Sequence, residues 1–152
     1  MKITVLGSGS WGTAVACLFA DMGHDITLWS YLPTECEALS RDKENKEFLP
    51  GVKIPDTVKF TTDFDSLNTA ELIVTAVPSH ATRATARNIK DKYNGCPILN
   101  ISKGLEQNAA KRGISNSTRR EFMKIKVLFI CHGRTYSPAD KASIYATFKT
   151  LL

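Results

Sequence analysis

The sequence is poor in cysteine and has no long apolar run. Its four cysteines are widely separated and show no metal-ligand spacing; they are Cys17, Cys36, Cys96 and Cys131. A disulfide framework and a metal site are therefore not expected, whereas reduced thiols in the cytoplasm are. No apolar run, including residues 127–131, is long enough to cross a bilayer, and the chain start lacks the apolar core of a signal peptide. We expect a cytoplasmic globular protein with no membrane partner.

Charge is not spread evenly along the chain. The 152 residues include 20 Lys or Arg and 15 Asp or Glu, which gives a net charge of +5. Residues 1–107 hold 11 basic and 13 acidic side chains, whereas residues 108–152 hold 9 and 2. A basic segment of this kind can bind a polyanion, but a solvated chain end has the same composition. We therefore do not expect nucleic acid as a partner, and a polyanion-binding protein stays an alternative.

A glycine-rich turn stands near the start of the chain, between the apolar residues 3–6 and a run of small residues suited to a helix. It reads Gly7-Ser8-Gly9-Ser10-Trp11-Gly12. In a Gly-x-Gly-x-x-Gly between strand and helix, the first glycine permits the tight turn. The second lets the backbone approach a pyrophosphate, and the third lets the helix pack closely on the strand. Phosphates would bind N–H groups at the helix N-terminus, so the turn predicts a dinucleotide site.

Helix and strand patterns alternate after the turn. A helix over residues 10–22 and a strand over residues 25–29 complete a βαβ unit. Further helices are expected at 34–46 and 81–93, and further strands at 58–62, 71–77, 97–102 and 125–131. The connector 48–55 carries two prolines, so it is expected to be neither helix nor central strand. Near-continuous apolar strands are typical of parallel sheets, so the predicted class is α/β, a doubly wound parallel sheet of Rossmann type in a single domain.

Candidate ligand contacts follow the ends of the predicted strands. After the second strand, where dinucleotide sites place an acid for a ribose hydroxyl or a base for a 2′-phosphate, the chain has Ser30 and Tyr31. The choice between NAD and NADP is therefore open, and Ser30 could bind either ribose substituent. Tyr31 is expected on the adenine face or as an ordinary strand-end aromatic. The loop at Pro78 is expected beside the cofactor, while His80 is expected to be structural or solvated.

Five motifs occur in a fixed order within residues 1–107. They are Gly7-Ser8-Gly9-Ser10-Trp11-Gly12-Thr13-Ala14, Leu28-Trp29, Phe48-Leu49-Pro50-Gly51-Val52-Lys53-Ile54-Pro55, Ala76-Val77-Pro78-Ser79 and Ser102-Lys103-Gly104-Leu105-Glu106. Together they resemble the N-terminal half of the NAD(P)-dependent glycerol-3-phosphate dehydrogenases. The resemblance implies that residues 7–12 hold the dinucleotide and that Tyr31 contacts its adenine side. It also implies that Lys103 reaches toward cofactor and substrate, where an ammonium would stabilise negative charge; a solvated strand-end lysine is the alternative.

The resemblance implies an oxidoreductase of glycerophospholipid metabolism, which moves a hydride between glycerol 3-phosphate and dihydroxyacetone phosphate with NAD or NADP. It stops after Gln107, and the family's helical substrate domain and proton-transferring lysine do not follow. We therefore expect a truncated dinucleotide-binding domain over residues 1–107 that binds these substrates weakly or not at all and is inactive alone. Its catalytic residues stay unknown, and a homodimer stays open. A non-catalytic dinucleotide-binding module or a gene fragment is the alternative.

The rest of the chain is expected to contain a basic helix or linker at 108–122, then a strand and a tail at 123–152. Residues 127–133 resemble the opening of low-molecular-weight protein tyrosine phosphatases, which need a cysteine and, six residues on, an arginine. Here Ser137 stands six residues after Cys131, and Arg134 stands three after it. Phosphatase chemistry is therefore not expected, and Cys131 is expected to be an inert buried thiol. The strand around it is expected to fill a sixth place in the sheet.

Overall fold

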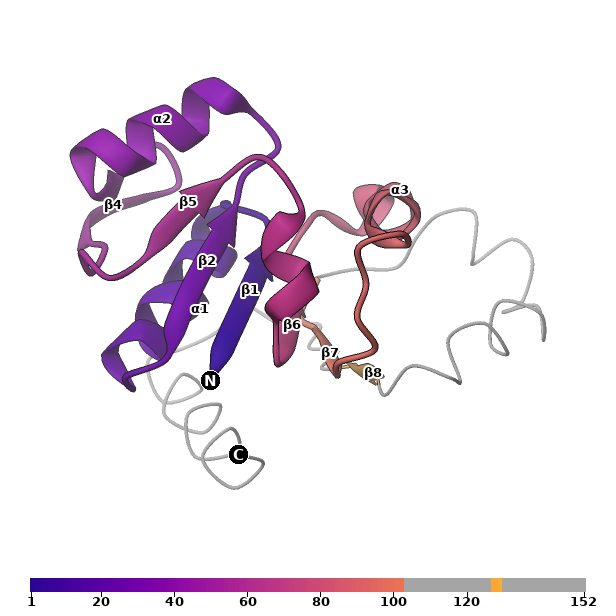
Figure 1. Cartoon of the computed structure of the whole chain (residues 1–152). Helices are drawn as coiled ribbons and strands as arrows, with labels where there is room; N and C mark the ends of the chain where they lie inside the picture. The colour runs from indigo at the N-terminus through magenta and orange to yellow at the C-terminus, as the bar shows by residue number, and fades with distance from the viewer. Residues whose placement is uncertain (103–126, 130–152) are drawn as a thin grey trace.

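Six parallel strands form the central sheet of the computed structural model, which describes residues 1–102 and 127–129 (Figure 1). Their order across the sheet is β5-β2-β1-β6-β7-β8. The strands are β1 Lys2–Leu6, β2 Asp25–Trp29, β5 Lys59–Thr61, β6 Leu72–Thr75, β7 Ile98–Asn100 and β8 Val127–Phe129. Every neighbouring pair is parallel. The chain starts at the centre, winds outward to β5 and then returns to the other side of β1, which confirms the predicted doubly wound sheet.

Helices cover both faces of this sheet (Figure 1). They are α1 Ser10–Asp21, α2 Pro33–Asp42, the 3-10 helix η1 Asp65–Thr69 and α3 Ser79–Ile89. Alternate strand residues point to opposite faces, so the central strands β1, β2, β6 and β7 contribute to two apolar clusters. One cluster joins the strands to α1 and includes Ile3, Val5, Phe19, Ile26, Leu28 and Val74. The other lies on the side of η1 and α3 and includes Leu6, Trp29, Leu67, Ile73 and Ile89. Burial on both faces explains the near-continuous apolar composition of the strands.

A small hairpin stands apart from the central sheet. It pairs β3 Glu44–Asn45 with β4 Leu49–Lys53 in antiparallel register. The helix predicted to run to residue 46 is therefore too long, because α2 ends at Asp42 and Lys43 adopts a left-handed conformation with φ of 51°. The proline-bearing connector does contain a strand, but β4 pairs only with β3, as expected for a segment excluded from the central sheet.

The remaining bounds differ by a few residues from those expected. The helix expected at 81–93 begins at Ser79, directly after Pro78, whose carbonyl accepts a hydrogen bond from the Ala81 N–H at 2.8 Å. It ends at Ile89, and the turn after it is fixed by Asn94, whose Nδ2 donates to the Ala70 carbonyl at 2.8 Å. The segment expected as the sixth strand contributes β8, which pairs with β7. In the described residues, no helix has the length and apolar composition that a membrane span requires.

Candidate functional site

The glycine turn lies at the carboxyl edge of the sheet, where β1, β2 and β6 end together. The Gly7 N–H donates to the Trp29 carbonyl at 3.0 Å, and the Ala76 N–H donates to the Leu6 carbonyl at 2.8 Å. These bonds hold the turn between the ends of the two neighbouring strands. The winding of the chain reverses at β1, and ligands of open α/β sheets bind in the crevice at such a reversal.

The three glycines of the motif have different surroundings. Gly7 has φ of +114°, and a Cβ there would lie 3.0 Å from the backbone of Ala76 and Val77. A Cβ on Gly12 would overlap the carbonyl oxygen of Gly7. Gly9 has an ordinary φ of −64°, and a Cβ there would meet no atom within 4 Å. Gly7 and Gly12 therefore permit the turn and the close packing of α1, whereas Gly9 faces open space.

The N-terminus of α1 opens onto the same space. No side chain caps the helix at Gly9, and its first turn contains no acidic residue. The first-turn N–H groups of a helix have no carbonyl partner within the helix, and the macrodipole adds partial positive charge there. Ser10 is exposed, and Trp11 is partly buried against the core cluster on the α1 side. Backbone donors and open space at one point suit a phosphate group.

A chain of buried hydroxyls runs beneath the turn. Ser8 Oγ donates to Ser30 Oγ at 2.9 Å, and Ser30 Oγ donates to Glu35 Oε2 at 2.6 Å. Ser8 is 4% exposed and Ser30 is 1% exposed. The sequence allowed Ser30 to bind a ribose substituent, but in the structure its hydroxyl is buried and not available at the surface. Glu35 was not identified from the sequence. The available signal was an acidic residue in the first helical turn after β2.

The surroundings of Glu35 are acidic. Burial raises the pKa of the neighbouring Cys36 thiol, and the carboxylates of Glu37, Glu35 and Asp63 raise it further. A thiolate is disfavoured by burial and by nearby negative charge, so the raised pKa reports both. Three carboxylates, those of Glu35, Glu37 and Asp63, therefore lie near the start of the helix that follows β2.

Asn45 is a second residue that sequence reasoning missed. Its side chain is buried, and its Nδ2 donates to the Ser8 carbonyl at 2.7 Å and to Thr13 Oγ1 at 2.8 Å. Thr13 Oγ1 in turn donates to the same Ser8 carbonyl at 3.1 Å. The Asn45 Oδ1 accepts the Phe48 N–H at 3.1 Å. The Asn45 side-chain amide thus joins the hairpin to the glycine turn across 37 residues of sequence. No local sequence pattern predicts such a contact.

Replacing Asn45 with alanine is expected to lower the free energy of unfolding by about 1–3 kcal/mol, because buried hydrogen-bonding groups lose their partner. The change in urea-denaturation midpoint measures it. Asn88→Ala is the matched control, since Asn88 is exposed on α3 and its removal is expected to change stability by less than about 0.5 kcal/mol. Equal midpoints for the two variants would show that Asn45 does not hold the turn.

The other candidate contacts lie at the same edge of the sheet. Tyr31 follows β2, is 77% exposed and meets Trp29 edge-on, with 6.3 Å between ring centroids. Pro78 is exposed at the start of α3, two residues after the Ala76 backbone that contacts Gly7. His80 is exposed in the first turn of α3, in keeping with a solvated side chain. Lys103, Cys131 and the basic residues after 107 lie outside the described residues.

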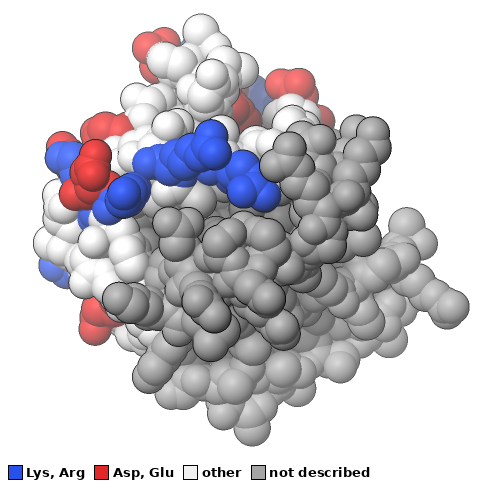
Figure 2. All heavy atoms as spheres, turned by 90° about the vertical axis from the view of Figure 1, so that its right-hand side faces the viewer, with Lys and Arg blue, Asp and Glu red and all other residues white. Residues whose placement is uncertain are grey.

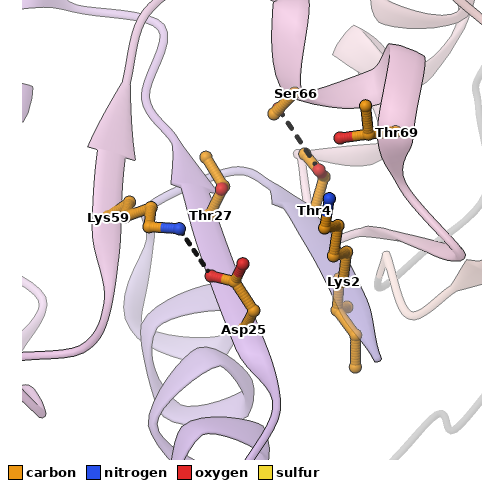
Figure 3. Close-up of a pocket in the computed structure, with 8 residues that line it drawn as sticks. Lys2, Thr4, Asp25, Thr27, Lys59, Ser66 and Thr69 are labelled. Carbon is orange, nitrogen blue, oxygen red and sulfur yellow. Dashed lines mark hydrogen bonds and ion pairs between the residues drawn. The ribbon is translucent and has the colours of Figure 1, made fainter.

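A polar hollow of about 210 Å³ lies at the opposite edge (Figure 3). Lys2 and Asp25, at the first positions of β1 and β2, line it, and Lys59 Nζ is 2.8 Å from Asp25 Oδ1. Thr4 Oγ1 donates to Ser66 Oγ at 3.2 Å on its other side. The hollow reaches only to Thr4 and Thr27 in the middle of these strands, whereas the glycine turn follows the last residue of β1. In the described residues, no group of three or more His, Cys, Asp or Glu side chains could hold a metal ion.

Basic side chains form a row on the face that carries α3 (Figure 2). The exposed basic residues of this helix and of the turn after it are Arg83, Arg87, Lys90 and Lys92. Lys92 Nζ forms an ion pair with Asp65 Oδ1 at 2.7 Å, which raises the pKa of the lysine. These basic side chains therefore belong to the exposed surface of α3 and of the turn that follows it.

The chain is similar to one family of dehydrogenases over most of its length. The family described as NAD-dependent glycerol-3-phosphate dehydrogenase N-terminus matches residues 2–131. A glycerol-3-phosphate dehydrogenase [NAD(P)+] of Chlorobium limicola is 42% identical over 114 residues, which are 74% of this chain and 34% of that protein. One of Moorella thermoacetica is 45% identical over 113 residues, 73% of this chain and 34% of that protein. The chain thus spans about a third of the length of these curated relatives.

Solved structures show the same fold. The crystal structure of glycerol-3-phosphate dehydrogenase from Coxiella burnetii has a TM-score of 0.70 and 28% identity, and the match covers 85% of this chain and 39% of that one. An imine reductase from Myxococcus stipitatus has a TM-score of 0.58 and 18% identity, with 88% of this chain and 41% of that one covered. At 18% identity, the second likeness concerns the fold alone.

Proposed function

Because the chain belongs to the family of NAD-dependent glycerol-3-phosphate dehydrogenase N-terminal domains, we propose that it binds NAD(H) or NADP(H) across the glycine turn. The observation that carries the proposal is the contrast among the three glycines. Backbone atoms occupy the space where a side chain of Gly7 or Gly12 would lie, whereas a Cβ on Gly9 would meet nothing within 4 Å. The space that Gly9 keeps open lies at the uncapped N-terminus of α1, where a pyrophosphate finds N–H donors and a favourable dipole.

The remaining contacts follow from the positions of the strand ends. The N–H groups of residues 7–12 hold the pyrophosphate, and the exposed ring of Tyr31 packs on the adenine side. The loop at Pro78 lies beside the cofactor, next to the backbone that Gly7 contacts. Lys103 lies outside the described residues, three positions after the last residue of β7 in the sequence, and in this proposal it carries the charge for a substrate oxygen or phosphate. The nicotinamide, when bound, supplies or accepts the hydride.

We propose that the substrate pair is glycerol 3-phosphate and dihydroxyacetone phosphate, and that this chain alone binds the cofactor without turning the pair over. The relatives named for this reaction are about three times as long as the matched segment, whose share of them is 34%. A substrate must be held in near-attack geometry before hydride can move, which takes several groups. A non-catalytic dinucleotide-binding module is the alternative. The alternative of polyanion binding rests on the basic side chains after residue 107, which lie outside the described residues.

We propose a cytoplasmic location, supported by three free cysteines, Cys17, Cys36 and Cys96, in the described part of the chain. Burial raises the pKa of Cys17 and of Cys96, which favours the protonated thiol. A homodimer stays a prediction that size-exclusion chromatography with light scattering would check.

Titration of the chain with NADH is expected to give a saturable rise in nicotinamide fluorescence. Subsequent addition of dihydroxyacetone phosphate is expected to consume no NADH. The proposed substrate contact of this chain is the single ammonium group of Lys103. One exposed charge of this kind stabilises a transition state by roughly 1 kcal/mol, whereas enzymes lower barriers by about 8 kcal/mol or more. NADH absorbance followed over time measures consumption in the same sample.

The control for binding is the chain unfolded in urea. NADH mixed with the unfolded chain is expected to fluoresce as NADH does without the chain. If neither reduced nucleotide alters its fluorescence with the folded chain, the binding proposal is wrong. Turnover that is lost in Lys103→Ala but kept in Lys92→Ala would show that the chain is an enzyme by itself. Lys92 is the matched lysine, since it pairs with Asp65 on the surface.

A further inference from the structure

Glu35 is joined to the glycine turn through the buried serines. Its Oε2 accepts the Ser30 hydroxyl at 2.6 Å, and Ser30 accepts the Ser8 hydroxyl at 2.9 Å. The carboxylate is half-buried in the first turn of α2, and its orientation is fixed by this bond. In the part of the chain that the structure describes, its other oxygen, Oε1, accepts no hydrogen bond. Glu35 therefore has a fixed position, and its Oε1 is available to accept a hydrogen bond.

The bond to Ser30 holds Glu35 beside the end of β2. In dinucleotide sites the adenosine ribose lies over the end of the second strand, where an acid binds its 2′-hydroxyl. Here β2 ends at Trp29, and Ser30 follows it with a hydroxyl that points inward and is 1% exposed. The side chain that Ser30 holds is Glu35. The bond to Ser30 thus brings a carboxylate to the strand end, although Glu35 comes five residues after Ser30 in the sequence.

The charge at this point opposes a 2′-phosphate. Residues 30–37 contain two glutamates and no Lys or Arg. Glu35, Glu37 and Asp63 together raise the pKa of Cys36 beyond the effect of burial. A 2′-phosphate requires a basic partner and would meet like charge instead, while a 2′-hydroxyl can donate to a carboxylate.

From these contacts we propose that Glu35 selects NAD(H) over NADP(H), by accepting a hydrogen bond from the ribose 2′-hydroxyl through the oxygen that Ser30 leaves unengaged. This inference rests on the dinucleotide binding proposed above. It assigns specificity to a residue that is outside the glycine motif and is not the residue directly after β2.

The test is parallel titration of the full chain with NADH and with NADPH, read by nicotinamide fluorescence. The wild-type chain is expected to bind NADH at least about tenfold more tightly than NADPH, since a hydrogen bond to a charged group is gained with one ligand and repulsion with the other. Glu35→Gln is expected to bring the two dissociation constants within about threefold of each other. Because both titrations use one preparation, a partly unfolded fraction affects both equally and leaves their ratio unchanged.

Glu37→Gln is the matched control. It removes the same charge from the same helical turn, but Glu37 is exposed and has no bond to Ser30, so it loses only part of the repulsion and the ratio is expected to fall much less than in Glu35→Gln. Equal affinities in the wild-type chain, an unchanged ratio in Glu35→Gln, or an equal loss of selectivity in Glu37→Gln would each overturn the assignment. If neither nucleotide binds the wild-type chain, the proposed function itself fails, which is a distinct result.

Discussion

Replacing Gly9 with valine is expected to weaken NADH binding at least about 100-fold, because two or more charge-assisted bonds from backbone N–H groups to phosphate are lost. The fold is expected to persist. Gly9 has φ of −64° and ψ of 178°, which any residue adopts, and an added Cβ meets no atom within 4 Å. The valine side chain therefore extends from an unobstructed Cβ into the space assigned to the pyrophosphate. Fluorescence titration measures the affinity, and thermal melting by circular dichroism checks the fold.

Two further variants sharpen this result. Gly9→Ala adds a single carbon and is expected to weaken binding less than valine does. Ala84→Val places the same side chain on the exposed face of α3, and is expected to leave the affinity unchanged. Unaltered NADH affinity in Gly9→Val, with the melting temperature preserved, would mean that the ligand does not pass over Gly9.

The βαβ unit was predictable because its signals are local. Residues 3–6 are apolar and lead directly into glycine, the helix pattern then follows, and Gly23 ends it. The structure places β1, α1 and β2 within one residue of the expected bounds. Val74 in β6 and Leu28 in β2 are both fully buried, which is why continuous apolar runs identified parallel strands.

The contacts that hold the site were not predictable, because they join residues far apart in sequence. Asn45 reaches Ser8 across 37 residues, and Ser30 reaches Ser8 across 22. The hairpin that carries Asn45 depends on Lys43, a residue without a helix-stop signature that nevertheless takes a left-handed conformation. Its conformation is supported by the tertiary structure, since Lys43 Nζ donates to the Val58 carbonyl and lies 4.8 Å from the Phe60 ring centroid.

Gly12 illustrates how a binding motif can be a packing requirement. It is buried in α1, and a Cβ there would overlap the Gly7 oxygen and lie 3.0 Å from the Gly7 carbonyl carbon. The Ala76 Cβ would be 3.2 Å away on the other side. These neighbours are backbone or the first side-chain atom, so none can rotate aside. An extra carbon at this position must push α1 away from the ends of β1 and β6.

Replacing Gly12 with alanine is accordingly expected to lower the free energy of unfolding by about 3 kcal/mol or more, the upper range for an overpacked core. Helix propensity alone predicts the opposite sign, a gain of about 1 kcal/mol. Urea denaturation followed by circular dichroism measures the change. Ala14→Gly, the reverse exchange two residues along the same helix, is the matched control and is expected to cost only about 1 kcal/mol. A Gly12→Ala variant as stable as the wild-type chain, or more stable, would show that α1 can shift without loss and that the close approach to Gly7 is not required.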